Sequence, residues 1–377
     1  MKTSLTIGSA GGIPIEVNYT WIAIFGLITW TLAVSWFPAY NPGLPPASYW
    51  TAAVLSTLLL FISILLHELS HSFVARKNGI PIKKITLFIF GGVAQMEKEP
   101  SSPSVEFKVA VAGPLCSAFI AVFCFAAYQT ASQLSMEPLV ISVIGYTGII
   151  NASLAVFNMI PGFPLDGGRL LRATIWHFDS SLKEATHIAS NFGKLFSFAF
   201  MLLGLVYLFF GQIISGVWFI IIGFFIHEAA DLAYQHLVLK KALVGTKLRD
   251  IMVKEVICVP SDLVLERLVE DYFYKYRHLG FPVVDNGIFK GMVTMQGIKT
   301  VPNSEWGSCK VEKVLQEPKK ELLSCPDEDA LDALIQVSKS GLGKLLVIDK
   351  GRLVGIIAQR DLVKLFEIKE NLCDFKS

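Results

Sequence analysis

The chain has few charged side chains, and they are unevenly placed. Asp, Glu, Lys and Arg make up 17% of the 377 residues, whereas apolar residues make up 53%. Such a low charged fraction is unusual for a soluble globular protein. Long runs almost free of charge lie between residues 21 and 230, and the ordinary mixture of Lys, Glu and Asp returns from Lys240 onward. The composition therefore predicts a membrane domain followed by a soluble domain.

Other absences narrow the functional classes. The net charge is only +2 and no block of Lys or Arg is present, so we expect no nucleic-acid partner. The six cysteines form no CxxC pair and share no metal-ligand spacing, which indicates free thiols in a reducing compartment. Gly11, Gly12 and Pro14 interrupt the first 18 residues. We therefore expect no cleavable signal peptide.

Six segments are apolar over the roughly 20 residues that a helix needs to cross a bilayer. They are residues 19–37, 49–75, 109–128, 139–160, 192–210 and 213–233. Basic residues gather after the second and fourth segments, whereas the loops at 38–48 and 129–138 contain none. By the positive-inside rule, we expect an integral, multi-pass protein of the cell (inner) membrane, with both termini and the soluble domain in the cytoplasm.

The connection between the second and third segments predicts a small β-hairpin. Two runs rich in β-forming residues, within Ile85 to Met96, flank Gly91 and Gly92. We expect these two glycines to form the turn. Because a strand edge cannot face lipid, the hairpin should pack on helices or line a cavity.

The second apolar segment ends in His67-Glu68-Leu69-Ser70-His71, an HExxH sequence. Positions i and i+4 share one face of a helix, so both imidazoles can bind the same ion, and the glutamate can act as a general base. Ionisable groups within a membrane segment are costly and are functional by default. The alternative is a buried polar cluster that links helices.

A zinc site of this kind needs a third protein ligand. Pro161, Gly162 and Pro164 must break the fourth helix, and Asp166 follows directly. Broken backbone at membrane depth is tolerated where it lines a polar cavity, so Asp166 is the predicted third ligand. The alternative is an ordinary cytoplasmic turn.

We expect no role in metal binding or catalysis for three other polar groups. His227-Glu228-Ala-Ala-Asp231 has ligand-like spacing but no partner motif, and it is interpreted as helix-end polarity or an interhelical contact. Arg169 and Arg172 are expected to anchor the chain at the membrane interface.

HExxH on one membrane segment, with Asn158 and the sequence N-x-x-P-x-x-x-x-D-G-G on a later one, resembles the site-2 protease family of intramembrane metalloproteases. The likeness covers roughly residues 1–235 and includes the glycine hairpin and Ala112-Gly113-Pro114. It implies one Zn²⁺ per chain, bound by His67, His71 and Asp166. It also implies Glu68 as the base and Asn158 as the residue that positions the substrate or stabilises the oxyanion. The implied substrate is a single-pass transmembrane protein, cut within the lipid bilayer.

The soluble part contains a repeat at a spacing of about 65 residues, which indicates two units that pack together. Each unit is predicted to contain strand, helix, strand, strand and helix. The first unit begins with a strand at Val256 to Pro260, and the second ends with a helix after Asp361. The segment from Gly355 to Asp361 resembles the end of a CBS domain, the module named after cystathionine β-synthase. The resemblance implies an adenosine nucleotide near Thr294 and Asp361. Gly297 and Ala358 depart from that pattern, so a structural role, or homodimerisation through the CBS domains, stays open.

The predicted fold is a polytopic α-helical membrane domain with six transmembrane helices and a small membrane-associated β-hairpin, followed by an α/β tandem CBS pair. The predicted domains are residues 1–240, 245–303 and 308–370. The predicted function is an intramembrane-cleaving zinc metalloendopeptidase that the CBS pair modulates. One alternative is a CBS-regulated transporter, which would often show inverted repeats. The other is a non-proteolytic membrane scaffold, although all four metal-site residues are present.

Overall fold

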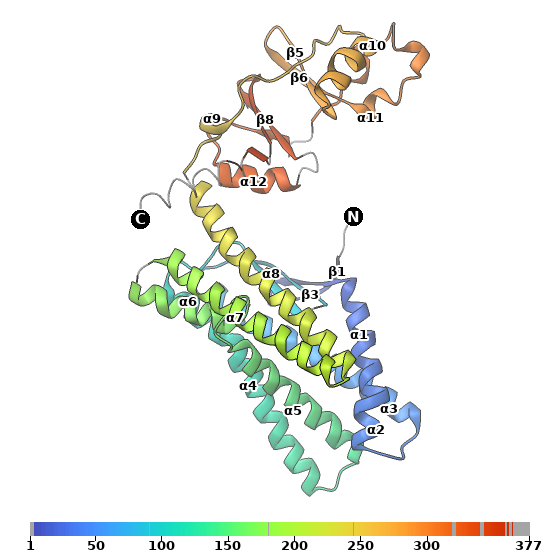
Figure 1. Ribbon diagram of the computed structural model, residues 1–377, viewed down its shortest axis with the longest axis vertical. Coiled ribbons are helices and arrows are strands. Elements are labelled where there is room, and N and C mark those ends of the chain that lie inside the picture. The colour runs from blue at the N-terminus through green and yellow to red at the C-terminus, as the bar shows by residue number, and fades with distance from the viewer. Residues whose placement is uncertain are drawn as a thin grey trace. The chain divides into compact units, whose positions relative to one another are not determined.

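The computed structural model describes residues 4–89, 91–179, 181–243, 245–318, 322–339, 343–358, 360–361 and 364. The chain divides into two compact units, and the division falls between Gln235 and His236. The first unit consists of long helices and one sheet, and the second is a smaller α/β unit (Figure 1).

Within the described residues, six helices are long and apolar enough to cross a membrane, which confirms the six predicted segments. The first comprises α1 (Thr20–Thr31), the π-helix η1 (Leu32–Trp36) and α2 (Phe37–Tyr40). The others are α3 (Pro46–Lys77), α4 (Pro103–Gln133), α5 (Pro138–Asn158), α7 (Leu182–Phe209) and α8 (Ile213–Leu243). The chain is a multi-pass membrane protein.

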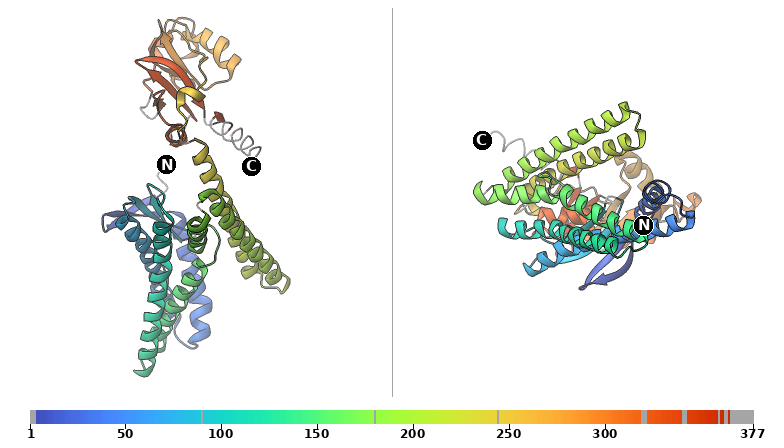
Figure 2. Two further views of the ribbon diagram at one scale, coloured as in Figure 1. Left: turned by 90° about the vertical axis from the view of Figure 1, so that its left-hand side faces the viewer. Right: turned by 90° about the horizontal axis from the view of Figure 1, so that it is seen from below.

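Several helices begin earlier than predicted, because each starts at a proline. Pro46, Pro103 and Pro138 occupy the first turns of α3, α4 and α5. Proline is favoured there, since the first N–H groups of a helix have no intrahelical partner. Helices α7 and α8 lie side by side as an antiparallel pair (Figures 1 and 2). Their short connection at Gly211 and Gln212 explains this arrangement.

The membrane unit also contains a four-stranded sheet, of which only part was predicted. Its strands are β1 (Ser4–Ala10), β2 (Ile13–Asn18), β3 (Ile82–Phe88) and β4 (Gly91–Met96), in the order β1-β2-β3-β4. The β1–β2 hairpin was missed, although Gly11 and Gly12 both adopt the positive φ that a two-residue hairpin turn requires. Strand β2 pairs with β3 in parallel, which joins the two hairpins.

The predicted position of the β3–β4 turn was wrong. Gly91 pairs with Phe88 and Gly92 pairs with Leu87, so both glycines belong to β4 and the turn precedes them. The packing explains why glycine is needed there: a Cβ atom on Gly92 would lie 2.6 Å from Cγ of Glu68. The absent side chain lets β4 approach α3, as expected of a hairpin that packs on helices.

The predicted helix break after the fourth span is present. Helix α5 ends at Asn158, and the short helix α6 (Asp166–Asp179) begins after an irregular loop. This loop docks on α7, where the Phe163 N–H donates to the Ala189 carbonyl over 3.1 Å. A Cβ atom on Gly193 of α7 would lie 2.1 Å from the Phe163 carbonyl oxygen. The glycine therefore allows the loop to contact the α7 backbone directly.

The second unit contains the two predicted repeats, which confirms the tandem α/β arrangement. The first has α9 (Leu248–Ile251), α10 (Leu265–Arg267), the π-helix η2 (Leu268–Tyr274), β5 (Gly280–Asp285), β6 (Ile288–Thr294) and α11 (Met295–Ile298). The 3₁₀ turns η3 (Asn303–Glu305) and η4 (Val311–Val314) follow. The second has β7 (Leu323–Ser324), α12 (Ala330–Lys339), β8 (Lys344–Asp349) and β9 (Arg352–Ala358).

One predicted element of the repeats is shorter than expected, and another falls largely outside the described residues. The strand predicted at Val256 to Pro260 is reduced to one parallel bridge between Val259 and Val283. The helix predicted after Asp361 falls largely outside the described residues. One apolar core surrounds Phe281 of the first repeat. The other surrounds Leu345 of the second repeat and includes Leu248 of α9, so the start of the first repeat packs on the second.

Candidate metal centre

Two histidines from α3 and the first residue of α6 meet at one point. Nε2 of His67 and Nε2 of His71 lie 3.1 and 3.0 Å from Oδ2 of Asp166, and 3.2 Å from each other. Both histidines are only 4% exposed. Ligand atoms arranged tetrahedrally around zinc, at bond lengths of about 2.0–2.1 Å, lie roughly 3.3 Å apart. The donor types and their spacing therefore fit a zinc ion.

Helix α4 fixes the orientation of both imidazoles. Nδ1 of His71 donates to the Val109 carbonyl over 2.6 Å, and Nδ1 of His67 lies 2.9 Å from the Ser117 hydroxyl. Because a carbonyl can only accept, the His71 proton lies on Nδ1 and leaves Nε2 with a free lone pair. Such contacts hold a metal-binding histidine in the correct tautomer and direction. Sequence reasoning did not find these two contacts.

A glycine on α4 provides the space for the two histidines. A Cβ atom on Gly113 would lie 2.2 Å from Nε2 of His71 and 2.5 Å from Nε2 of His67. Any side chain at this position would thus enter the volume that a metal ion needs. Gly113 belongs to the Ala-Gly-Pro sequence noted above, and the structure supplies a physical role for it.

The three candidate ligands, His67, His71 and Asp166, line a cavity of about 510 Å³ within the membrane unit. Glu68 and Asn158 line the same cavity, as do Arg169 and strand β4. The Asn158 amide donates to the Leu154 carbonyl over 3.0 Å at the end of α5. The structure therefore brings together all five residues that the sequence singled out for metal binding and catalysis.

The two arginines after Asp166 contact a buried carboxylate and an aromatic ring, which the sequence did not indicate. Nε of Arg172 donates to Oε1 of Glu106 on α4 over 2.8 Å, and Nε of Arg169 lies 4.0 Å from the same oxygen. The Arg172 guanidinium also lies over the Phe163 ring, 5.0 Å from its centroid. Both residues lie on α6 and face the Glu106 carboxylate.

The second histidine motif is an interhelical contact, as predicted. Nδ1 of His227 on α8 lies 3.2 Å from the Ser197 hydroxyl on α7. Asp231 forms an ion pair with Lys194, also between α8 and α7.

The two residues predicted at the nucleotide site have partners within the chain. The Thr294 hydroxyl accepts from the Gly297 N–H and donates to Oε1 of Gln316, both over 3.2 Å. The Asp361 carboxylate accepts from the Ala358 N–H over 2.9 Å. Both side chains therefore have local structural roles.

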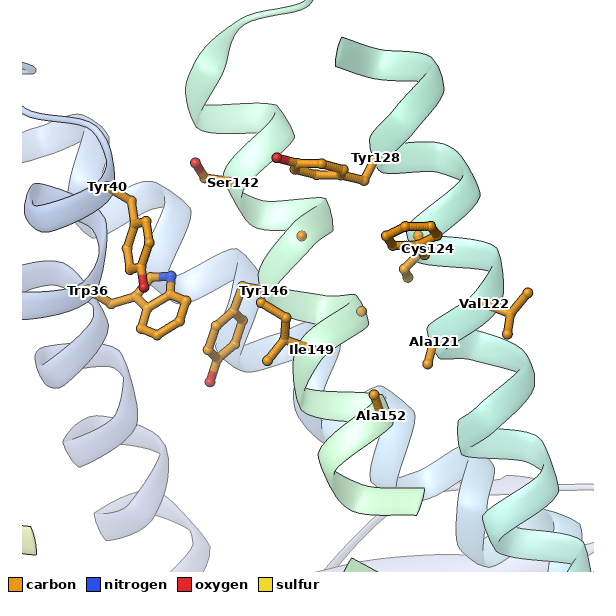
Figure 3. Close-up of a pocket in the computed structure, with 13 residues that line it drawn as sticks. Trp36, Tyr40, Ala121, Val122, Cys124, Tyr128, Ser142, Tyr146, Ile149 and Ala152 are labelled. Carbon is orange, nitrogen blue, oxygen red and sulfur yellow. The ribbon is translucent and has the colours of Figure 1, made fainter. Parts of the chain in front are cut away.

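A second cavity, of about 550 Å³, lies along α4 and α5 away from the metal ligands. Figure 3 shows Trp36, Tyr128 and Tyr146 among the side chains that line it. Its lining contains no Asp, Glu, His, Lys or Arg. Its lining includes Cys124 and Ser142, but no carboxylate or imidazole that could act beside them as a general base.

Comparisons with known proteins agree with this geometry. The family model of peptidase family M50 matches residues 55–135 and 129–204, and the CBS domain model matches residues 248–302 and 315–368. A zinc metalloprotease of Methanocaldococcus jannaschii is 31% identical over 382 residues, covering 99% of this chain and 100% of that protein. The chain belongs to peptidase family M50, the site-2 proteases.

Other relatives span most of this site-2 protease. Rip3 of Mycobacterium tuberculosis is 29% identical over 372 residues, covering 98% of this chain and 94% of its own length. The solved structure of the site-2 protease from M. jannaschii is 31% identical and covers 61% of this chain and 95% of that one, with a TM-score of 0.44. By its family model and its full-length relatives, the present chain is a zinc metalloendopeptidase of the site-2 protease type, followed by two CBS domains.

Replacing Gly113 by alanine tests the space at the metal centre. The added methyl group would lie within contact distance of both Nε2 atoms, so we expect Gly113→Ala to lose most of its bound zinc while remaining folded. Metal analysis of the purified protein measures this. Gly26 of α1 has nothing within 4 Å of its Cβ position, so Gly26→Ala is the matched control. Full zinc occupancy in Gly113→Ala would show that α4 does not limit the site.

Proposed function

We propose that this protease cleaves a peptide bond in or next to the transmembrane helix of a single-pass membrane protein. One Zn²⁺ ion, held by His67, His71 and Asp166, would serve the reaction. The observation that carries the proposal is the convergence of these three ligand atoms in a cavity that Glu68 also lines.

The depth of the site supports cleavage within the bilayer. Helix α3 ends with the basic residues Arg76 and Lys77, which suit the membrane interface. His67 precedes Arg76 by nine residues, and at 1.5 Å per residue this separation is about 14 Å. The hydrocarbon core is about 30 Å thick. The histidine would therefore lie near the middle of the bilayer.

The roles of the surrounding residues follow from their positions. When bound, a zinc ion supplies Lewis acidity that activates water for attack on a peptide carbonyl. Glu68 lines the same cavity and would accept the proton from the attacking water, then pass it to the leaving amine. The Asn158 side chain would position the substrate or donate to the developing oxyanion.

Strand β4 offers a way to hold the substrate. It is an edge strand of the sheet, and Gly91 to Ala94 line the cavity. A substrate helix must unwind before its carbonyls can be attacked, and an extended segment can add to a free strand edge. We propose that the substrate pairs with β4 beside Glu68.

We propose that the protein lies in the cell (inner) membrane. Both termini and the CBS pair would then be in the cytoplasm. The basic residues that follow α3 and α5 support this topology. We propose domains at residues 1–240, 245–303 and 308–370, and the two CBS matches lie within the second and third of these. We further propose that the CBS pair modulates the protease, as a homodimer.

The contacts of Thr294 favour a structural role for the CBS pair over nucleotide sensing. Its hydroxyl is already bonded to Gln316 and Gly297. The alternative is an adenosine nucleotide that contacts Thr294 and Asp361 after displacing Gln316.

Loss of the general base gives the direct test of catalysis. We expect Glu68→Gln to lower cleavage of a transmembrane substrate by about 10²- to 10⁴-fold, the usual contribution of a general acid–base group. Zinc content should stay unchanged, because the three ligands remain. Glu228→Gln, in the interhelical motif of α8, is the matched control. Equal product from Glu68→Gln and the native protein would refute the catalytic role.

Proline substitutions test pairing of the substrate with β4. Neighbouring residues of a strand direct their N–H groups to opposite sides, so Val93→Pro and Ala94→Pro together cover both edges of β4. We expect at least one of them to raise KM for a transmembrane substrate without loss of zinc. Thr6→Pro, in the opposite edge strand β1, is the control. Unchanged cleavage by both β4 variants would exclude strand addition.

Nucleotide titration distinguishes a structural role of the CBS pair from nucleotide sensing. Because a ligand that binds only the folded state raises Tm, we expect ATP and AMP to leave the Tm of the full chain unchanged. A saturable rise in Tm that Thr294→Val abolishes would instead establish nucleotide binding.

A further inference from the structure

One face of α4 supports the whole metal centre. Glu106, Val109, Gly113 and Ser117 follow one another at intervals of three or four residues, which places them on the same side of the helix. Ser117 and Val109 bind the two histidines, and Gly113 makes room for them. The remaining residue of the row, Glu106, does not contact the histidines. It contacts α6, the helix that carries Asp166.

Glu106 is fully buried, with 0% of its surface exposed. Its Oε1 atom accepts two hydrogen bonds from the Arg172 guanidinium and lies 4.0 Å from Nε of Arg169. Its Oε2 atom is also buried and has no hydrogen-bond partner among the described residues. A buried carboxylate gives little net stability even when it is paired. Stability alone therefore does not explain its presence here.

Arg169 could disturb the metal centre if Glu106 were absent. Residues at i and i+3 of a helix are neighbours, and an Asp–Arg pair at this spacing is attractive. Asp166 and Arg169 have this spacing on α6, and both line the cavity. An ion pair between them would turn the Asp166 carboxylate away from the histidines. The Glu106 carboxylate offers Arg169 a competing partner on the other side.

Arg172 connects Glu106 to the loop that precedes Asp166. Its guanidinium lies over the Phe163 ring while it binds Glu106. The position of Asp166 is therefore fixed by contacts of residues on either side of it in the chain. Phe163 packs before it, and the arginines bind after it.

We propose that Glu106 is a positioning residue for the metal centre. Through Arg172 it fixes α6 against α4, and through Arg169 it keeps a guanidinium away from Asp166. The inference rests on the proposed function, in which Asp166 is a zinc ligand.

The test compares metal binding in the full-length protein purified in detergent. Zinc affinity is measured by competition with a chelator, and the visible spectrum of the Co²⁺-loaded protein reports the ligand geometry. We expect Glu106→Gln to weaken zinc binding by about 10-fold or more, as loss of an outer-shell partner does, and to change the Co²⁺ spectrum. The double variant Glu106→Gln with Arg169→Gln should regain part of the affinity, because the competing guanidinium is gone while Arg172 still lacks its carboxylate partner.

Asp231→Asn is the matched control, since it breaks another interhelical ion pair, with Lys194, outside the metal centre. It should leave the zinc affinity and the Co²⁺ spectrum unchanged. Native zinc affinity in Glu106→Gln would overturn the proposal, as would a double variant that binds no better than Glu106→Gln. If Glu106→Gln does not fold, Glu106→Asp, which withdraws the carboxylate by one methylene, should still shift the Co²⁺ spectrum. An unchanged spectrum there would also overturn it.

Asp166→Asn distinguishes this inference from the function on which it rests. Undiminished zinc binding in Asp166→Asn would refute the ligand assignment itself. Loss of zinc in Asp166→Asn, together with native binding in Glu106→Gln, would refute only the positioning role.

Discussion

The close approach of two imidazole nitrogens and one carboxylate oxygen, all within 3.2 Å of one another, is the constraint on which the membrane unit depends. In a membrane interior, such groups are expensive unless they are paired or bind a metal. Two helices must therefore bring these three atoms to one point, and a third helix must hold the imidazoles in place. Helix α3 supplies the histidines, α6 supplies Asp166, and α4 orients the imidazoles through Val109 and Ser117.

Missing side chains make this convergence sterically feasible. Gly113 leaves room at the histidines, Gly92 lets the edge strand reach Glu68, and Gly193 receives the loop before Asp166. In each case the atom that a Cβ would strike belongs either to a site residue or to the backbone that leads to one. Membrane helices often use small residues to approach closely. Here the same device allows a strand and an irregular loop to approach the metal centre as well.

The sequence was sufficient to predict those features that depend on short patterns. The six spans follow from hydrophobic length, the pair of histidines from helical spacing, and the ligand loop from Pro161 and Pro164. The features that it missed depend on how helices cross. Val109, Gly113 and Ser117 are ordinary residues of an apolar helix, and their spacing does not indicate that they face α3. Glu106 lies in the first turn of α4, where an acidic residue already has a local reason to be.

The charges around the cavity explain why these features belong together. Counted as formal charges, Glu68, Asp166 and Glu106 contribute three negative charges and Arg169 and Arg172 two positive ones, so the set has one negative formal charge in excess when the histidines are neutral. A divalent cation reverses that sign, and a positive environment favours the negative charge that develops on an attacked carbonyl oxygen. In the proposed role Glu106 maintains this balance, because the only acidic residues that line the cavity together with Arg169 are Glu68 and Asp166. A carboxylate with no proposed contact to metal or substrate would in this way protect Glu68 and Asp166, the two carboxylates that are proposed to take part in the reaction.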